Sequence, residues 1–426
     1  MKIRHGRRMQ CAPPPRVSSR PATREGDIAT DAGALQVLTF LHAPGPGGVE
    51  RIALRLIAGW QRAGTTVHLV LGDPDGPMAD DRIAGSVVPV PFRRPARVLN
   101  WRTLAMLRAC LRAVRTRRPD IIFCPGNSYT IIAVLLKIRL GQHCPPILAK
   151  ISNDLIRADM PVPLRACYTM WLRIQGRAID HFAVLSEPMA RETVTRLRID
   201  PARVHVVPNP VLSLADLDRC AQLPRTASHG GGRRFVAVGR LEPQKNYPLM
   251  LRAFAAASRP EDRLTIYGDG RERAALHALA RRLGIDTRVD FAGFRADILK
   301  RLSDHDVLLL SSRYEGQPGA VVEALARGIA IIATRCCGSM APLLDDGALG
   351  ALVPRDDEQA FAQAIRMARP TPMDSSRARE KAAAFTLESA VPAYDRLFRH
   401  ILNGAPAGQR GAAHPPARHS LEAQPS

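Results

Sequence analysis

The chain has 426 residues, of which 46% are hydrophobic and 23% charged, a composition that argues against a disordered, collagen-like or coiled-coil protein. No run of about 18 apolar residues occurs in the sequence, so a membrane-spanning helix is not expected. The length predicts two or three domains. The net charge of +22 either indicates an anionic partner or reflects a general preference for arginine on the surface.

From residue 35 onward, apolar runs alternate with amphipathic helical patterns, which is typical of β-α units and a parallel sheet. Residues 1–34 are basic and rich in Pro and Ser, and we expect a disordered tail there. Apolar residues at helical spacing predict helices over 49–63 and 101–117. A first domain is therefore expected over 35–212, with strands at 35–41, 67–71, 87–90, 121–124, 147–151, 182–185 and 204–207.

After Pro208-Asn209-Pro210 the composition changes. Residues 213–232, which end in Ser-His-Gly-Gly-Gly, are predicted to form a linker, and the Gly- and Pro-rich residues 404–426 a second disordered tail. A second β-α series predicts a further domain over 233–386 with strands at 235–239, 264–267, 289–291, 307–310 and 330–333. The predicted fold class is α/β, with two Rossmann-like, doubly wound parallel-sheet domains.

The segment from Ser311 to Gly328 carries the most chemistry. It follows a predicted buried strand, passes through a Gly/Pro turn and opens a helix, whose free N–H groups would form an anion site. Glu315 precedes the turn and Glu323 follows eight positions later; a carboxylate there can accept hydrogen bonds from the vicinal hydroxyls of a ribose. A loop carboxylate and an ordinary surface glutamate on a helix would give the same pattern.

Three other turns between strand and helix contain glycine or cations. Arg240 and Lys245 follow the first strand of the second domain and can reach a diphosphate from one side, unless both are simply solvated. The turns at 43–50 and 267–270 are rich in glycine, which lets a backbone approach a ligand closely. The dinucleotide pattern G-x-G-x-x-G is not met in the first of them.

Taken together, these motifs make the chain resemble glycosyltransferase family 4 (group 1) over residues 35–403. The resemblance implies the GT-B fold, in which two Rossmann-like domains face a central cleft, and sugar transfer with retention at the anomeric carbon. It also implies that residues 387–403, with Tyr394, form a helix that crosses back to the first domain. The motifs are Gly47-Gly48, Gly239-Arg240-Leu241, Gln244-Lys245-Asn246, Tyr267-Gly268-Asp269-Gly270 and the pair Glu315 and Glu323.

The resemblance also implies roles for individual residues. Arg240 and Lys245 would hold the diphosphate of a nucleotide sugar in the second domain, and Glu315 would bind the donor sugar; these three are the predicted catalytic residues. Glu323 would bind the ribose. The remaining predicted donor-binding residues are Gly47, Gly48, Gly268, Gly270, Gln317, Pro318, Gly319, Ala320 and Val321.

The sequence departs from the family pattern in two places. Many members carry a histidine in the middle of the first domain, where this chain has Asn153 and Asp154. We expect these two residues to face the acceptor, and no general base is assigned. A glutamate that is common after the turn near Gly338 is replaced by Pro342.

No metal or other cofactor is expected. The two D-x-D strings, at 73–75 and 304–306, lie in a loop and at a junction between helix and strand. None of the twelve histidines lies at ligand spacing from another, and the eight cysteines include no C-x-x-C pair, which indicates a reducing compartment. We therefore expect a cytoplasmic protein, peripheral on the inner face of the cytoplasmic membrane.

The expected function is retaining transfer of a sugar, from a UDP-sugar rather than a GDP-sugar, to an envelope polysaccharide or a lipid-linked acceptor. A nucleotide-sugar epimerase of the same fold is an alternative. A nucleic-acid-binding protein is another, although aromatic residues are only 5% and no array of basic and aromatic residues is apparent.

The first domain is the more basic one: residues 35–212 contain 24 Lys or Arg against 12 Asp or Glu, whereas 233–403 contain 26 against 21. An anionic membrane surface is therefore a further candidate partner. Part of the charge lies on 101–118, a predicted helix whose apolar face either packs on the sheet or lies at a lipid interface. That face is formed by Leu104, Leu107, Leu111 and Val114.

Overall fold

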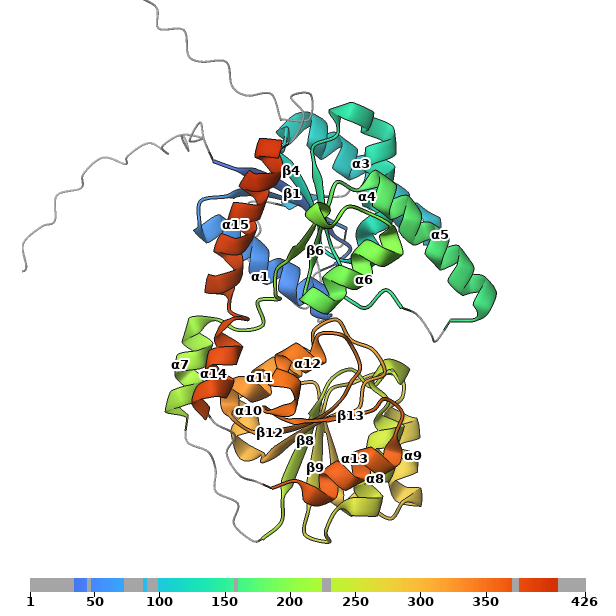
Figure 1. Ribbon diagram of the computed structural model, residues 1–426, viewed down its shortest axis with the longest axis vertical. Helices are drawn as coiled ribbons and strands as arrows, with labels where there is room; N and C mark the ends of the chain where they lie inside the picture. Colours follow the sequence, from blue (N-terminus) through green and yellow to red (C-terminus); the bar gives the residue numbers. More distant parts are fainter. Residues whose placement is uncertain are drawn as a thin grey trace, which may run out of the picture. The chain divides into compact units, whose positions relative to one another are not determined.

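The structure is a computed structural model, and it describes residues 34–43, 47–72, 87–89, 99–156, 160–223, 231–369 and 375–404 (Figure 1). Apart from Ala34 and Gly404, both predicted tails lie outside the described residues. The described chain forms two parallel sheets, each with its own flanking helices. The predicted α/β class with two Rossmann-like domains is confirmed.

The first sheet has seven parallel strands in the order β3-β2-β1-β4-β5-β6-β7. Its central strands are short and buried on both faces, as β4 (Ile-Ile-Phe-Cys) illustrates, because helices cover both sides of a parallel sheet. Every predicted strand of this domain is present within one residue at either end. The strands are β1 (Gln36–Leu41), β2 (Thr66–Leu71), β3 (Val87–Pro89), β4 (Ile121–Cys124), β5 (Ile147–Lys150), β6 (His181–Val184) and β7 (Val204–Val206).

The helices of the first domain divide between the two faces of this sheet. The direction of strand succession reverses after β3, and right-handed crossovers then place α1 on one face and the following helices on the other. Contacts run from α3 to α4, from α4 to α5 and from α5 to α6, so these four helices form one row (Figure 1). The row consists of α3 (Leu99–Arg117), α4 (Thr130–Leu140), α5 (Val162–Ala178) and α6 (Glu187–Leu197), and the helix on the other face is α1 (Gly48–Arg62).

Helix α3 settles part of the question left open by its sequence. Leu107 and Val114 are buried in the core of the first domain, and Leu111 packs against that core, so most of the apolar face packs on the protein. Leu104 is largely exposed. The side chains of Trp101 and Arg102 lie outside the described part.

The second sheet has six parallel strands in the order β10-β9-β8-β11-β12-β13. The sequence predicted five of them and missed the last, Ala-Leu-Val, because three residues give too short a pattern. The strands are β8 (Arg234–Val238), β9 (Arg263–Tyr267), β10 (Val289–Gly293), β11 (Val307–Leu310), β12 (Ala330–Thr334) and β13 (Ala351–Val353). The helices are α8 (Tyr247–Ala257), α9 (Arg273–Arg282), α10 (Ile298–Arg301), α11 (Gly319–Arg327), α12 (Met340–Leu343), α13 (Glu358–Met367) and α14 (Ser375–Ala383).

The prediction of a linker over 213–232 is wrong in its first half, which forms helix α7 (Leu214–Gln222). Ser213 caps this helix through a capping box with Asp216, and this arrangement satisfies two otherwise unpaired N–H groups. Leu217 and Cys220 are buried in the core of the second domain. The sequence analysis did not predict this helix, because the Gly-rich end of 213–232 dominates the composition of the segment. Residues 224–230 lie outside the described part.

The last helix, α15 (Leu387–Gly404), confirms the predicted crossover to the first domain (Figure 1). It packs along α1. Its aromatic side chains Tyr394 and Phe398 contact Trp60 and Phe123 edge-on, with ring centroids 5.2–6.4 Å apart. Such pairs add about 0.5–1.5 kcal/mol each beyond the apolar area they bury, so the C-terminal helix is part of the first domain's core.

Candidate active site

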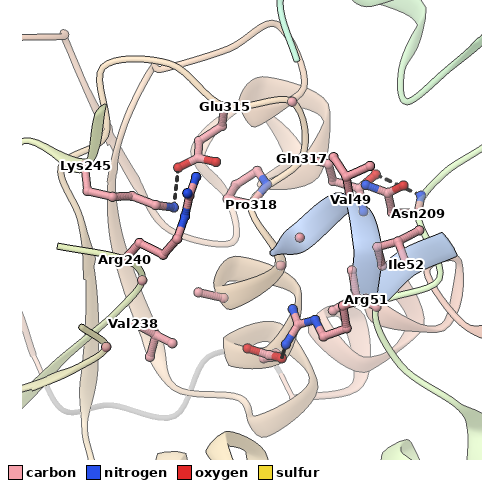
Figure 2. Close-up of a pocket in the computed structure, with 18 of the residues that line it drawn as sticks. Val49, Arg51, Ile52, Asn209, Val238, Arg240, Lys245, Glu315, Gln317 and Pro318 are labelled. Atoms are coloured by element: carbon pink, nitrogen blue, oxygen red, sulfur yellow. Dashed lines mark hydrogen bonds and ion pairs between the residues drawn. The ribbon is translucent and has the colours of Figure 1, made fainter. Parts of the chain in front are cut away.

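A cavity of about 460 Å³ is lined by residues of both domains (Figure 2). It lies where the carboxyl ends of β5, β8, β9 and β11 meet the first turns of α1 and α11, as expected for a ligand site in α/β folds. Most of the predicted site residues line it: Gly48, Asn153, Arg240, Lys245, Gly268, Glu315, Gln317, Pro318, Gly319, Ala320 and Glu323.

Four of the predicted residues do not line the cavity. Val321 is fully buried in the core of the second domain, because its position in the first turn of α11 points it at the sheet. Gly270 lies against the backbone of Leu241, so its small size serves packing between two turns. Gly47 is the N-cap of α1, and Asp154 does not itself line the cavity, although the adjacent Asn153 does.

Lys245 and Glu315 form the central charged pair of the site, with 2.5 Å between Nζ and Oε1. The hydroxyl of Ser312 donates a second hydrogen bond to the same carboxylate oxygen at 2.7 Å. Charge-assisted hydrogen bonds of this length are strong and fix the direction of both side chains. The sequence predicted both residues of the pair but not that they touch.

Three hydrogen bonds to backbone carbonyls tie the two turns that carry this pair. The backbone N–H of Arg313 donates to the carbonyl of Gln244, and the side-chain amide of Gln244 donates to the carbonyl of Tyr314, both at 2.8 Å. The hydroxyl of Ser311 donates to the carbonyl of Lys245 at 2.8 Å. The turn after β8 and the turn after β11 therefore form one unit, although they are about 70 residues apart in sequence.

Arg240 is exposed at the rim of the same cavity. Figure 2 shows its guanidinium directed toward Lys245 and Glu315. An arginine and a lysine that converge on one space supply a planar fork and a point charge for an anion. The turn keeps its shape because Gly239 and Gly268 approach closely: a Cβ on Gly268, whose φ is 144°, would lie 1.9 Å from the carbonyl oxygen of Gly239.

Glu323 is buried on α11 and is not an ordinary surface glutamate. Its carboxylate lies 3.9 Å from Arg51 of α1 in the first domain. Burial raises the pKa of Glu323, while the positive charges of Arg51 and Arg55 oppose that rise. The first turn of α11 begins after the N-cap Pro318 and directs free N–H groups toward the cavity.

The wall from the first domain carries a buried cation that the sequence did not single out. Lys150, the last residue of β5, is 2% exposed and lines the cavity. Burial lowers the pKa of its amine to about 7. A lysine at the end of a strand looks unremarkable in the sequence, and only the packing around it reveals the cost of its charge.

The pKa of Asp154, which directly follows the cavity-lining Ser152 and Asn153, is also shifted. Burial raises the pKa of Asp154 to about 7, the negative charge of Glu192 adds to this, and Arg355 opposes it. Asn153 is exposed and lines the cavity, and its role toward an acceptor stays a prediction. Of the two predicted acceptor residues, the structure thus places only Asn153 on the cavity wall.

Several buried polar atoms at the cavity wall have no hydrogen-bond partner within the described chain. They include Ser152 Oγ, Asn209 Oδ1 and Gln317 Nε2. Asn209 and Gln317 already meet across the domains, where the Asn209 N–H donates to Gln317 Oε1 at 3.2 Å (Figure 2). Unpaired buried polar groups are costly, so a cluster of them around a cavity is typical of a site that binds a polar ligand.

The cavity also has one exposed aromatic ring. Phe294, which follows β10, is 61% exposed and lines the cavity next to Arg295. An exposed ring beside a polar cavity offers a flat apolar surface on which a planar group can stack. Phe294, Lys150 and Arg51 are site residues that the sequence analysis missed. Phe294 lies outside any motif, whereas Arg51 and Lys150 lie close to Gly48 and Asn153 but form no pattern of their own.

The D-x-D string at 304–306 has a structural role. The Asp306 carboxylate accepts hydrogen bonds from the backbone and guanidinium of Arg234, at 2.9 Å each. The other string, 73–75, lies outside the described residues. Across the part of the chain that the structure describes, no three His, Cys, Asp or Glu side chains are grouped as metal ligands, and metal independence stays a prediction.

Comparison with known proteins gives the family. Residues 46–212 match the family described as "Glycosyltransferase Family 4", and residues 232–368 match "Glycosyl transferases group 1". The lipopolysaccharide core biosynthesis glycosyltransferase LpsE of Rhizobium meliloti is 35% identical over 30% of this chain and 37% of its own length. The UDP-Gal:alpha-D-GlcNAc-diphosphoundecaprenol alpha-1,3-galactosyltransferase of Escherichia coli is 24% identical over 75% of this chain and 84% of its own length.

Solved structures agree on the fold. Anabaena HepE, in complex with UDP-glucose, superposes with a TM-score of 0.67 at 18% identity, over 86% of this chain and 100% of HepE. Sucrose-phosphate synthase from Thermosynechococcus elongatus superposes with a TM-score of 0.70 at 18% identity, over 87% of this chain and 99% of its own. Matched segments span less than half the length of LpsE and of several other relatives. The two family matches and the GT-B fold together identify the chain as a member of glycosyltransferase family 4, group 1.

Proposed function

We propose that the protein transfers a sugar from a nucleotide diphosphate sugar, preferably a UDP-sugar, to a lipid-linked or envelope polysaccharide acceptor with retention at the anomeric carbon. The observation that carries the proposal is the convergence of Arg240 and Lys245 beside Glu315 in a cavity shared by both domains. Two cations on one turn suit a diphosphate leaving group, and a carboxylate next to them suits sugar hydroxyls.

In this reaction the bond between the anomeric carbon and the β-phosphate oxygen breaks. A new bond forms from the acceptor hydroxyl oxygen to the anomeric carbon, on the face that the diphosphate leaves. The hydroxyl proton passes to the departing phosphate oxygen, and no side chain of this chain is assigned as its carrier. Arg240 and Lys245 stabilise the negative charge that grows on the diphosphate, usually the largest contribution to catalysis of this kind.

The cavity suggests how the donor lies. With the diphosphate at Arg240 and Lys245, the nucleoside extends toward Phe294, where its base can stack, and toward Glu323, which accepts hydrogen bonds from the ribose. The sugar then lies at Glu315 and Gln317, opposite Gly48 of the first domain. Gly48 has open space around its Cβ position, which leaves room for the sugar. Lys150 faces the same space and adds positive charge.

The acceptor class is drawn from the relatives. The names of two relatives specify a sugar carried on diphosphoundecaprenol, and that of LpsE specifies the lipopolysaccharide core. Those proteins act on lipid-linked or envelope glycans, and we propose the same acceptor class here.

The decisive experiment measures thermal stabilisation by a panel of UDP-, GDP- and ADP-sugars, followed by transfer assays with the donor that stabilises most. We expect a UDP-sugar to stabilise most and the product to keep the anomeric configuration of the donor, as read from the anomeric coupling in NMR spectra. Formation of an epimerised sugar without transfer would identify an epimerase instead. Stabilisation by none of the donors would contradict the proposal.

Metal independence is tested in the same assay. Because Arg240 and Lys245 supply the positive charge for the diphosphate, transfer in excess EDTA should proceed at the original rate. Complete loss of transfer that Mn²⁺ or Mg²⁺ restores would show that the two cations are insufficient.

A further inference from the structure

One face of the first domain combines positive charge with exposed apolar side chains. Helices α3, α4 and α5 together contain ten Lys or Arg residues and no Asp or Glu. The next helix of the same row, α6, contains two of each sign. The contacts from α3 to α4 and from α4 to α5 place the three helices side by side over one face of the sheet (Figure 1). We call this surface the α3–α5 face.

Helix α5 is packed on the protein over only part of its length. Every residue from Pro161 to Cys167 is exposed, and its buried residues are Leu172, Gln175 and Gly176. On the opposite side, Met170 and Ile174 are exposed. The solvent-facing side of a helix in a globular protein ordinarily carries polar groups, so this side of α5 is unusually apolar.

Helix α4 continues the same property. Ile131 and Ile138 are seven residues apart and therefore lie on one side of the helix, and both are exposed, Ile138 by 66%. Arg139 follows directly and is exposed, as is Arg177 near the end of α5. The α3–α5 face thus alternates cations with aliphatic side chains. Its exposed large apolar residues are Leu104, Ile131, Ile138, Val162, Leu164, Met170 and Ile174.

We propose that the α3–α5 face docks on the surface of an anionic lipid bilayer, with the arginines at the headgroups and the aliphatic side chains in the interface. None of the described helices has the length and apolar composition needed to cross a bilayer, so the contact would be peripheral. A cationic helix surface with aliphatic residues matches anionic lipid. Single-stranded nucleic acid fits less well, because its sequence-tolerant binding uses aromatic rings for stacking. Duplex DNA would engage the cations through its phosphates but would leave the exposed aliphatic side chains without an apolar partner.

This proposal is independent of the donor chemistry, since its residues lie outside the cavity between the domains. Vesicle co-sedimentation of the full chain tests it, with vesicles of phosphatidylcholine alone or with phosphatidylglycerol. We expect binding to the anionic vesicles at low salt, little binding to the neutral ones, and a marked loss at high salt, because a Debye length of about 3 Å at 1 M screens the arginines.

Two pairs of surface variants test whether vesicle binding depends on the α3–α5 face or only on the overall positive charge of the protein. Arg139→Glu/Arg177→Glu should weaken vesicle binding by about fivefold or more for each arginine replaced, whereas Arg281→Glu/Arg282→Glu on α9 of the second domain should leave it unchanged. Met170→Asp should weaken binding clearly, whereas Met367→Asp on α13, where the side chain is also exposed, should not. All four variants should bind the nucleotide sugar like the wild type, so loss of docking is distinguishable from loss of donor binding.

Several results would overturn the proposal. These are equal binding to neutral and anionic vesicles, no binding to either at low salt, or equal losses in the control variants. Binding of duplex DNA without binding of vesicles would assign the face to nucleic acid. A dimer in light scattering that Met170→Asp dissociates, with no vesicle binding, would assign it to a second copy of the chain.

Discussion

The two walls of the cavity differ in how completely their polar groups are paired. On the second-domain wall, Lys245 and Glu315 bind each other and Ser312 adds a further hydrogen bond. On the first-domain side, Lys150 is buried with a lowered pKa, and the cavity-lining Ser152 Oγ has no partner in the described chain. The second-domain wall is therefore preorganised around Lys245 and Glu315, although Gln317 Nε2 on that wall is also unpaired, whereas the first-domain wall has no comparable charged pair among its described lining residues.

The difference also explains why most of the sequence motifs, apart from Gly47-Gly48, lie in the second domain. Residues that fix one another's position form a compact set at constant spacing, and such a set is recognisable in a sequence. Residues that do not contact one another have no such fixed spacing in the sequence. The following predictions test the comparison between the two domains, beginning with the largest effect.

The largest effect is expected from Arg233→Ala in the second domain. Arg233 and Asp262 form a salt bridge of 2.6 Å with both side chains almost fully buried. Removal of one partner leaves an uncompensated charge and should lower the free energy of unfolding by about 3–5 kcal/mol, as measured by urea titration. The matched change in the first domain, Lys137→Ala, breaks the more exposed pair with Asp180 and should cost only about 1 kcal/mol.

The same salt bridge predicts an acid dependence. Burial by itself would raise the pKa of Asp262, but hydrogen bonds from Arg233 and the backbone hold it below its ordinary value. The contribution of the Asp262 carboxylate to the free energy of unfolding is therefore present at neutral pH. It is lost as the pH falls through the pKa of Asp262 in the folded state. Equal urea midpoints for Arg233→Ala and wild type at pH 7 would contradict the assignment.

The next effect concerns Lys245, on the second-domain wall of the cavity. Lys245→Ala should weaken nucleotide-sugar binding by about tenfold to a hundredfold, the loss of one charge-assisted contact worth about 1.5–3 kcal/mol, as measured by calorimetry. Adding Arg240→Ala should give less than the sum of the two effects, because both cations serve one diphosphate. Lys300→Ala on α10, an exposed lysine outside the cavity, is the control. Unchanged donor affinity in Lys245→Ala would refute the diphosphate assignment.

On the opposite wall we expect Lys150→Met to increase stability while it lowers transfer. The folded state disfavours the charge on Lys150, whose pKa falls to about 7. The unfolded chain then binds more protons between pH 7 and about 10, so this group makes wild-type stability rise with pH in that window. The free energy of unfolding of Lys150→Met should not rise with pH in this way. At pH 7 it should exceed that of the wild type by about 0.5–2 kcal/mol.

Measurements of unfolding at pH 7 and pH 9, together with transfer rates, check this prediction. A variant that is less stable than the wild type and fully active would show that Lys150 is a structural residue. Such a result would remove the contrast between the two walls.

The smallest effects come from two buried tyrosines. The hydroxyl of Tyr247 in the second domain donates to the carbonyl of Gly239 at 3.0 Å, whereas the hydroxyl of Tyr394 on α15 has no partner in the described chain. Tyr247→Phe should therefore cost about 0.5–1.5 kcal/mol, and Tyr394→Phe should be neutral or stabilising by up to about 1 kcal/mol. Thermal melting of both variants measures the difference. The same loss in both would mean that the two hydroxyls are equally satisfied.

Much of the fold could be predicted from the sequence because it depends on short-range patterns. Buried strands such as residues 121–124 read as apolar runs, and the helices between them repeat every three to four residues. Where the pattern was too short, as at Ala351–Val353, or masked by glycines nearby, as at Leu214–Gln222, the prediction failed. For helix α3, the sequence could not tell what covers the apolar side, because the same pattern of apolar residues results whether a sheet or a lipid lies against it.

By itself, the sequence determined the parallel α/β architecture, since periodicity is a local property of a chain. The resemblance to glycosyltransferase family 4 added the crossover of residues 387–403 and the roles predicted for Arg240, Lys245 and Glu315. Only the tertiary structure decided that Lys245 meets Glu315, that Glu323 faces Arg51, and that Lys150 lies buried in the cavity wall. Those relations join positions about 70 or more residues apart, and burial, which sets the cost of each charge, depends on everything packed around it.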